Sequence, residues 1–372
     1  MIVNLIVIMI VVSLGYIFSK ILYPIKDSFN VRKLYIQIIS LILILQSGLR
    51  NVAVGTDTYG YFGMYEDVKL TSWNEIYNQF VIHYALGIGK DPGYSVFEKI
   101  AQLFLPQYQL FLFLIAILFF IALGNFILKN TTQLRDAVLS YVLYSVLFYS
   151  FFSITGHRQT IATAAVFYSF ELMKKNKFIY STVLILVAST IHQSCLIFLP
   201  FYFISKLKSP KNLLVLVLIL FPILFVISSK ISSIFIGLSQ NYEEYGHMEE
   251  YKPITFTLLM LLIVSVALIR YNKVVRIFPA AIMQYSAMIL MTFFLSLVFE
   301  IHIFMRIVQY FSIFILALVP LTFQSFDIYT RKLQNLFYGV VVLLLIAMSI
   351  KANINMEYKF FWQDMKLEDV YL

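Results

Sequence analysis

Arginines accompanied by histidines occur where apolar runs of this sequence begin or end. The segment GHRQ at 156–159 joins two such runs, and His302 and Arg306 open another. An arginine placed at the centre of a membrane helix costs about 2.5–3.5 kcal/mol on insertion scales, so each needs a compensating partner. Because a guanidinium binds phosphate oxygens through two parallel hydrogen bonds, these positions predict a site for a phosphate-bearing anion.

Two further residues have the chemistry of a general base. His192 lies in a polar break, STIHQS at 189–194, between two apolar runs. An unperturbed histidine has a pKa of about 6.5, which suits a base that works near neutral pH. Asp57, in the polar segment that follows Arg50, is the second candidate and would need burial to raise its pKa.

No stronger catalytic or cofactor motif accompanies these residues. The chain has no Walker loop and no GxGxxG, HExxH or GxSxG sequence, and Asp57-Thr58 and Glu66-Asp67 do not form a DxD-like pair. The single cysteine, Cys195, excludes a disulfide framework and a thiolate metal cluster. The sequence therefore predicts neither a metal nor another cofactor, and the chemistry of the candidate site is cationic.

The composition places these residues in a membrane protein. Hydrophobic residues make up 61% of the 372 positions, only 13% are charged, and the mean hydropathy is +0.85. Soluble domains carry about 25% charged residues. The sequence therefore predicts an all-α, polytopic integral membrane protein, with residues 1–372 forming a single transmembrane domain. The first run lacks a basic n-region and a cleavage site, so it is expected to be a retained helix.

The pattern of apolar runs predicts about twelve transmembrane helices, some of them short or re-entrant. Lys and Arg cluster after every odd-numbered run, and these connections, counted with Glu171 at the adjoining end of run 159–173, hold 17 of the 28 Lys/Arg but only 4 of the 19 Asp/Glu. Positive residues mark the cytoplasmic side, so both termini are predicted outside. The net charge of +9 is then a topology signal and not a nucleic-acid-binding surface. The runs span 2–18, 34–47, 109–128, 137–152, 159–173, 178–190, 193–205, 212–229, 254–269, 278–297, 303–321 and 333–350.

Two regions depart from simple helical crossings. Residues 48–108 are predicted to form a large extracytoplasmic loop, in which 94–105 has the pattern of an amphipathic helix at the membrane interface, and residues 351–372 a short extracytoplasmic tail. Basic clusters flank both ends of 178–205, so this stretch is predicted as two half-length helices that bend at 189–194. His192 would then lie within the membrane depth, which is tolerated beside a polar cavity.

The ionisable residues near helix ends gather on the predicted outer side. An arginine at one helix end is more often an interfacial anchor whose head group reaches water. Arg158 and Arg306, however, share one predicted side, each with a histidine within one helical turn. Ala162 and Ala165 follow Arg158 on one helical face and allow a neighbouring helix to approach closely. The pattern indicates an outward-open cavity lined with arginine and histidine.

The same residues resemble those of the EpsG family of polysaccharide polymerases, relatives of Wzy-type enzymes. The matching motifs follow the family order from residue 50 to residue 320 and cover most of the chain. They are Arg50 with GTDTY at 55–59 and Tyr61, PGY at 92–94 with Glu98, GHRQTIA at 156–162, ASTIHQS at 188–194, and MRIVQYF at 305–311 followed by Pro320.

The resemblance implies a polymerase of lipid-linked sugar repeats at the outer face of the bacterial cytoplasmic membrane. Such an enzyme transfers a growing glycan from undecaprenyl diphosphate onto the next lipid-linked repeat, making an extracellular, capsular or O-antigen polysaccharide. A flippase and a chain-length regulator are the expected protein partners, the bilayer is its surroundings, and nucleic acid is not a partner. The diphosphate is expected at Arg158, Arg306 and Arg50, and the base at His192 or Asp57. Further substrate contacts are expected at His157, Gln159, Glu98, His302 and Tyr310.

Two other functions stay open on the sequence. A ligase or another transferase would use the same lipid donor, and a flippase or secondary transporter would fit twelve helices. No repeat relates the two halves of the chain, and few charges fall at the predicted midplane, where a transporter needs them. Polar residues on one side of the membrane favour the polymerase.

Overall fold

The described part of the protein is helical throughout. The computed structural model describes residues 2–22, 28–55, 57–237, 253–301, 303–326, 331–352 and 357–364. Within these ranges every regular element is a helix, and the only strand-like pairing is an isolated bridge between Arg50 and Phe360. The predicted all-α fold is confirmed.

The helices group into two compact units. The first contains Met1–Glu171, Val183–Gln193 and Ile328–Leu372, and the second contains Leu172–Thr182 and Ser194–Asp327. The single transmembrane domain expected from the sequence stays a prediction.

Three of the helices in the described ranges are long and apolar enough to cross a membrane. They are α1 (Ile2–Ile17) with its π-helical extension to Leu22, α2 (Ser28–Gly48) and α6 (Tyr108–Asn130). Two bent pairs raise the number to five if each pair is one crossing. These pairs are α13 (Ile254–Ile269) with α14 (Tyr271–Ile277), bent by 73°, and α16 (Ile303–Ser312) with α17 (Ile315–Gln324), bent by 44°.

The remaining predicted runs coincide with shorter helices, or with α18 (Arg331–Ala352) in the first unit, so the total of twelve crossings stays a prediction. Two short helices each follow another helix directly: α12 (Ser228–Gly237) follows α11 (Lys211–Val226), and α14 follows α13. The elements not yet named are α7 (Leu134–Leu147) with a π-helix at Ser150–Thr155, α8 (His157–Lys174), α9 (Phe178–Ile191), α10 (Phe198–Ser205) and α15 (Ala281–Leu295).

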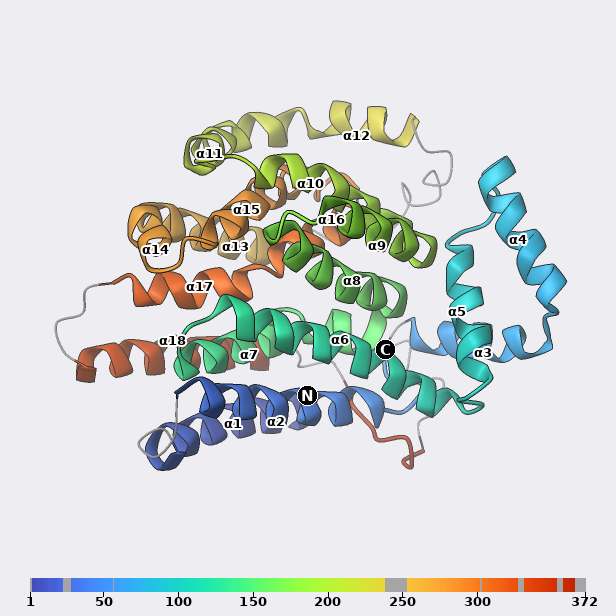
Figure 1. Cartoon of the computed structure of the whole chain (residues 1–372), viewed down its shortest axis with the longest axis horizontal. Helices are drawn as coiled ribbons and strands as arrows, with labels where there is room; N and C mark the ends of the chain where they lie inside the picture. The colour runs from blue at the N-terminus through green and yellow to red at the C-terminus, as the bar shows by residue number, and fades with distance from the viewer. Residues whose placement is uncertain are drawn as a thin grey trace. The chain divides into compact units, whose positions relative to one another are not determined.

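In the first unit, α2 lies lengthwise against α6 (Figure 1). The close approach depends on small residues, because a Cβ at Gly124 of α6 would lie 2.8 Å from the Ser40 hydroxyl of α2. That hydroxyl is within 2.8 Å of the Tyr141 hydroxyl of α7, which satisfies two polar groups in an apolar interior. Helix α1 packs on α2 and α7, and α18 packs on α7.

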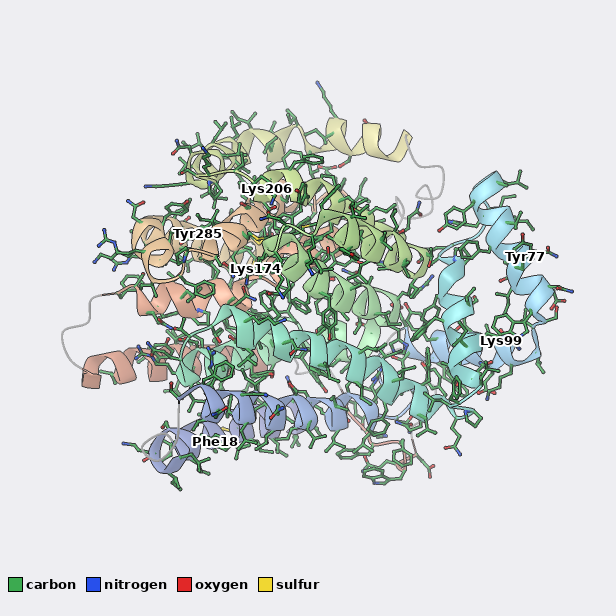
Figure 2. The ribbon with its side chains drawn as sticks, in the orientation of Figure 1. Phe18, Tyr77, Lys99, Lys174, Lys206 and Tyr285 are labelled. Carbon is green, nitrogen blue, oxygen red and sulfur yellow. The ribbon has the colours of Figure 1, made fainter. Side chains whose placement is uncertain are left out.

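In the second unit, α15 is the central helix, and it contacts α10, α11, α16 and α17. Nearly all of its side chains are buried, including Tyr285, whose hydroxyl donates to the Ala267 carbonyl at 2.7 Å. Figure 2 labels Tyr285 among the side chains of this unit. An all-round apolar helix is expected at such a position because every face needs an apolar neighbour.

The predicted loop 48–108 folds into three helices, α3 (Thr58–Leu70), α4 (Trp73–Leu86) and α5 (Pro92–Gln102), which lie together in Figure 1. Helix α5 packs against both α3 and α4. The segment with the amphipathic pattern, 94–105, therefore buries one side against protein. The same segment leaves Ile100, Leu103 and Phe104 exposed. Helix α4 also exposes apolar side chains, among them Tyr77 (Figure 2), with 68% of its surface accessible.

The C-terminal segment 357–364 returns to the start of this loop. The Phe361 amide donates to the Leu49 carbonyl, and the Asn51 amide donates to the Lys359 carbonyl, both at 2.9 Å. The Asn51 side chain also donates to the Gln363 carbonyl at 2.7 Å. The tail is thus fixed to the chain immediately beside Arg50.

The predicted break in 178–205 is confirmed. Helix α9 ends at Ile191, and a 3₁₀ turn, Gln193–Ile197, separates it from α10. Ser189 and Thr190 each donate a side-chain hydrogen bond of 2.8 Å to a carbonyl three residues earlier, a pattern that competes with continuation of the helix. His192 lies at the break.

Candidate functional site

The carboxylate of Asp91, in the turn between α4 and α5, joins two of the predicted site residues. Its Oδ2 atom lies 3.1 Å from Arg158 Nη1 and 3.4 Å from His192 Nδ1, while Oδ1 accepts the Gln193 amide at 2.9 Å. Only 2% of the Asp91 side chain is accessible. The structure therefore brings Arg158 and His192 to one buried acid, although they are 34 positions apart in the sequence.

Burial alone would raise the pKa of the Asp91 carboxyl. The hydrogen bond and charge of His192, the charge of Arg158 and the Gln193 amide together outweigh that effect and hold the pKa below its usual value. Asp91 is therefore ionised near neutral pH. An ionised carboxylate only accepts hydrogen bonds, so His192 Nδ1 carries a proton and Nε2 is the nitrogen at which the ring can gain or lose its second proton.

Two tyrosine rings hold the guanidinium of Arg158. Its carbon lies 5.5 Å from the ring centre of Tyr61 in α3 and 5.8 Å from that of Tyr94 in α5. The Tyr61 hydroxyl accepts a long hydrogen bond of 3.5 Å from Arg158 Nε. These contacts fix the plane of the guanidinium. With 18% of the side chain accessible, Arg158 is the most open of the three ionisable groups at this point.

The N-terminus of α5 packs directly on the end of α9. A Cβ at Gly93 would lie 2.8 Å from the carbonyl carbon of Thr190 and closer still to its side chain, so only glycine fits. This contact explains the PGY segment at 92–94 in physical terms. It sets the distance between Asp91 and the helix break that holds His192.

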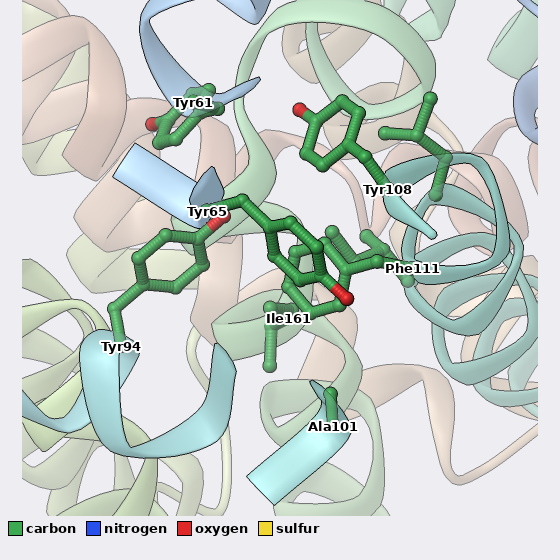
Figure 3. Close-up of a cluster of buried hydrophobic side chains, with 9 residues drawn as sticks. Tyr61, Tyr65, Tyr94, Ala101, Tyr108, Phe111 and Ile161 are labelled. Atoms are coloured by element: carbon green, nitrogen blue, oxygen red, sulfur yellow. The ribbon is translucent and has the colours of Figure 1, made fainter. Parts of the chain in front are cut away.

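The two tyrosines that contact Arg158 belong to an aromatic cluster of Tyr61, Tyr65, Tyr94, Tyr108 and Phe111 (Figure 3). Glu98 of α5 is buried in the same region, with no accessible surface. Neither of its oxygens has a hydrogen-bond partner of good geometry in the described part of the chain. Burial raises the pKa of Glu98 to about 8, against smaller opposing effects of Tyr94 and Arg158.

We expect Glu98→Gln to remove a pH-dependent loss of stability. A glutamate in the unfolded chain releases its proton near the ordinary pKa of 4.5, whereas the folded protein retains it up to about pH 8. The folded state binds the extra proton, so stability falls as the pH rises between these values. Thermal unfolding from pH 5 to pH 9 should show equal melting temperatures at the acid end and a more stable variant at the alkaline end.

Glu66→Gln is the matched control, because Glu66 is a partly exposed carboxylate paired with Lys69 on neighbouring α3. Its melting temperature should follow that of the wild type. Parallel curves for wild type and Glu98→Gln would contradict a raised pKa at Glu98.

Arg50 and His157 form a second group of buried polar side chains, next to the group of Asp91, Arg158 and His192. Arg50 is 2% accessible, and it donates to the carbonyl of Ser47, to the carbonyl of Ile154 at 3.3 Å and to His157 Nε2 at 2.6 Å. A guanidinium has no acceptor, so His157 accepts through Nε2 and its ring is neutral. The His157 ring stacks on Tyr61 with ring centres 4.4 Å apart. Because Tyr61 also contacts Arg158, it links the two groups.

The other predicted residues of the first unit have different surroundings. Gln159 is buried one position after Arg158, and its backbone carbonyl accepts from Thr163 at 2.7 Å. Asp57 is exposed at the start of α3 and makes no side-chain capping bond there. Thr58, the next residue, is buried and donates to the Val54 carbonyl at 2.7 Å.

Arg306 and Tyr310 belong to the second unit. Both lie on α16, where Tyr310 is fully buried and Arg306 is partly accessible. His302 lies outside the described residues. The structure therefore brings together Arg158, His192, Glu98, Arg50 and His157, whereas the part played by Arg306 stays a prediction.

Asp91 was not singled out from the sequence. It directly precedes the PGY motif, which was used, and it is the only acidic residue between Glu75 and Glu98. An acidic residue directly before Pro-Gly, with no other acid in the fifteen positions before it, is the signal that could have drawn attention to Asp91. Among the described residues, no group of three His, Cys, Asp or Glu side chains is arranged to hold a metal ion.

Several described helices are apolar enough to cross a membrane. With the buried cluster of Arg158, Asp91 and His192, they indicate a helical membrane protein that contains a polar site. A family model matches residues 33–363, and the chain belongs to the EpsG family, a family of Wzy-like polymerases. Membership indicates a general role in polysaccharide polymerisation, of the glycosyltransferase type. No curated protein and no solved structure matches the chain.

Proposed function

We propose that this protein polymerises undecaprenyl-diphosphate-linked oligosaccharide repeats at the outer face of the bacterial cytoplasmic membrane. Family membership supports the general activity. The observation that carries the specific proposal is that Arg158 and His192 contact the same carboxylate. A cation for a diphosphate and a base for a sugar hydroxyl thus lie within reach of one small ligand.

The proposed reaction is a single displacement. The acceptor hydroxyl attacks the anomeric carbon of the donor sugar, a new glycosidic bond forms, and the bond between that carbon and the diphosphate oxygen breaks. The lipid diphosphate leaves with the electron pair, and the proton of the hydroxyl passes to His192 Nε2. Arg158 stabilises the charge that develops on the leaving group, an effect that is often the largest in such reactions.

The remaining residues take supporting roles in this proposal. Arg306 is a second diphosphate ligand. Arg50 and His157 position Tyr61 and the start of α8, because their hydrogen bonds are directed to the chain itself. Asp57 is the alternative base or a contact for the acceptor. Tyr310, Gln159, Glu98 and His302 are assigned to substrate binding.

The proposed topology is that deduced from the charges, with twelve crossings, both termini outside, and α3, α4 and α5 in the outer loop. The exposed apolar residues of α4 suit contact with lipid head groups and acyl chains. A flippase would deliver the substrate to the outer leaflet, and a chain-length regulator would act with the polymerase.

Deleting the gene in its host and extracting the lipid-linked glycans tests the function. We expect single repeats to accumulate on the outer leaflet, where an added glycosidase can reach them, and complementation with the wild-type gene to restore long chains. Single repeats confined to the inner leaflet would instead identify a flippase. Long lipid-linked chains that are never transferred onward would identify a ligase.

A further inference from the structure

In the structure, the place opposite the Arg158 guanidinium is occupied by a carboxylate of the chain itself. Asp91 Oδ2 presents to Arg158 Nη1 the kind of anionic oxygen that a phosphate would present, at 3.1 Å. A ligand that binds Arg158 through its oxygens therefore competes with Asp91 for the same donor.

The backbone at Asp91 shows that this placement is imposed by its surroundings. Its φ of 51° and ψ of 53° are left-handed, a region that non-glycine residues adopt uncommonly, aspartate and asparagine more often than the others. The following residue is Pro92, which further disfavours helical angles at the position before it. Such strain persists where the environment over-determines it and is concentrated at functional sites.

The carboxylate also has partners that remain when Arg158 is taken away. His192 Nδ1 and the Gln193 amide both face it from the helix break. Loss of Arg158 would leave these two donors to hydrogen-bond the buried carboxylate. Asp91 can therefore release the arginine without being left in an apolar interior alone.

We propose that Asp91 is a positioning residue that gives up one partner during the reaction: it holds Arg158 while the site is empty, and the substrate diphosphate takes over this arginine and leaves the carboxylate to His192 and the Gln193 amide, which it already contacts. This inference rests on the proposed function. The exchange couples arrival of the leaving group to orientation of the base. With the carboxylate committed to His192, Nδ1 keeps its proton and Nε2 is directed to accept the proton of the sugar hydroxyl.

The exchange predicts opposite effects on binding and on turnover. Asp91→Asn removes the anion that competes for Arg158, so diphosphate should bind about tenfold more tightly and the KM for lipid-linked repeats should fall. The amide can donate to His192 Nδ1 and so favours the wrong tautomer, for which losses in kcat of about 10⁴-fold are known in an aspartate–histidine pair of another enzyme class. We expect kcat to fall at least a hundredfold.

The binding test uses geranyl diphosphate, a soluble diphosphate ester, titrated calorimetrically into the full-length protein in nanodiscs. The variants are Asp91→Asn, Arg158→Gln and their combination. Asp67→Asn is the control, since it removes an exposed carboxylate from the same loop. Asp91→Gly is the second test variant, because glycine adopts the left-handed backbone without strain and buries no polar side chain, so its fold does not depend on partners for an amide.

Tighter binding in both Asp91 variants, unchanged binding in Asp67→Asn, and loss of the gain when Arg158 is also replaced would support the exchange. Equal or weaker binding in Asp91→Asn and Asp91→Gly would overturn it, as would a gain that survives in the Arg158→Gln background. If no variant binds geranyl diphosphate and the gene deletion leaves polymer intact, the proposed function itself has failed. Polymer lost on deletion, with binding indifferent to Asp91, would refute the exchange alone.

Discussion

Replacing Arg158 with lysine is expected to stop most polymer synthesis while the protein still inserts and folds. Lysine keeps the positive charge and can still pair with Asp91. It loses the planar fork that contacts Asp91 through Nη1 and the Tyr61 hydroxyl through Nε, and it stacks less well between the two tyrosine rings. Removing one preorganised donor from a developing oxyanion typically costs about 10²–10³ in kcat, so a loss of this size is expected.

The measurement is polymer length and yield in cells that carry Arg158→Lys in place of the wild-type gene, with the amount of membrane protein determined in parallel. Arg276→Lys is the matched control, because Arg276 is an exposed arginine in the last turn of α14. Arg306→Lys is expected to behave as Arg158→Lys does. Full-length polymer from the double variant would mean that both arginines are only interfacial anchors.

Replacing His192 with alanine is expected to give the second large effect, a protein that binds lipid-linked substrate and does not join it. The alanine removes the basic Nε2 nitrogen but leaves Arg158 and its contacts in place. General-base catalysis contributes about 10²–10⁴ to rate. Turnover should therefore fall by this factor, while lipid-linked substrate still binds through Arg158.

Gln193→Ala serves as the control, since it removes an exposed neighbouring side chain and keeps the backbone amide that Asp91 accepts. It should polymerise normally. Because one displacement inverts the anomeric carbon, the product linkage should have the opposite configuration to that of the lipid-linked sugar. Retention in the wild-type product would exclude a single displacement, and normal polymer from His192→Ala would remove His192 from the reaction.

The positions of the long helices could be predicted because burial in lipid or protein demands continuous apolar residues. The run 109–128 became α6 at Tyr108–Asn130, within two residues at each end. The break at His192 was also accessible, since basic residues flank both sides of a stretch with a polar centre. In both cases the residues that predict the helix or the break are themselves part of it or directly flank it.

The contacts of the site could not be predicted because they join residues far apart in the chain. Asp91 is 67 positions from Arg158 and 101 from His192. Whether an acid in a loop is solvated or buried depends on how α5 packs on the end of α9, and sequence periodicity carries no information on that packing. Arg50 was predicted as a diphosphate ligand from its charge, which stays a prediction. Its hydrogen bonds in the structure go to main-chain carbonyls and to His157, contacts that its position in the sequence does not reveal.

The attachment of residues 357–364 to Leu49 and Asn51 gives the protein a fixed order of assembly during its synthesis. The Asn51 side chain and the Gln363 carbonyl that it contacts are 312 positions apart. A ribosome must therefore translate nearly all of the intervening helices before the chain beside Arg50 receives its last hydrogen bonds. A nascent polypeptide in which residues 357–364 are not yet synthesised lacks this closure, so the segment beside Arg50 gains its bonds to the tail only after translation has passed Gln363.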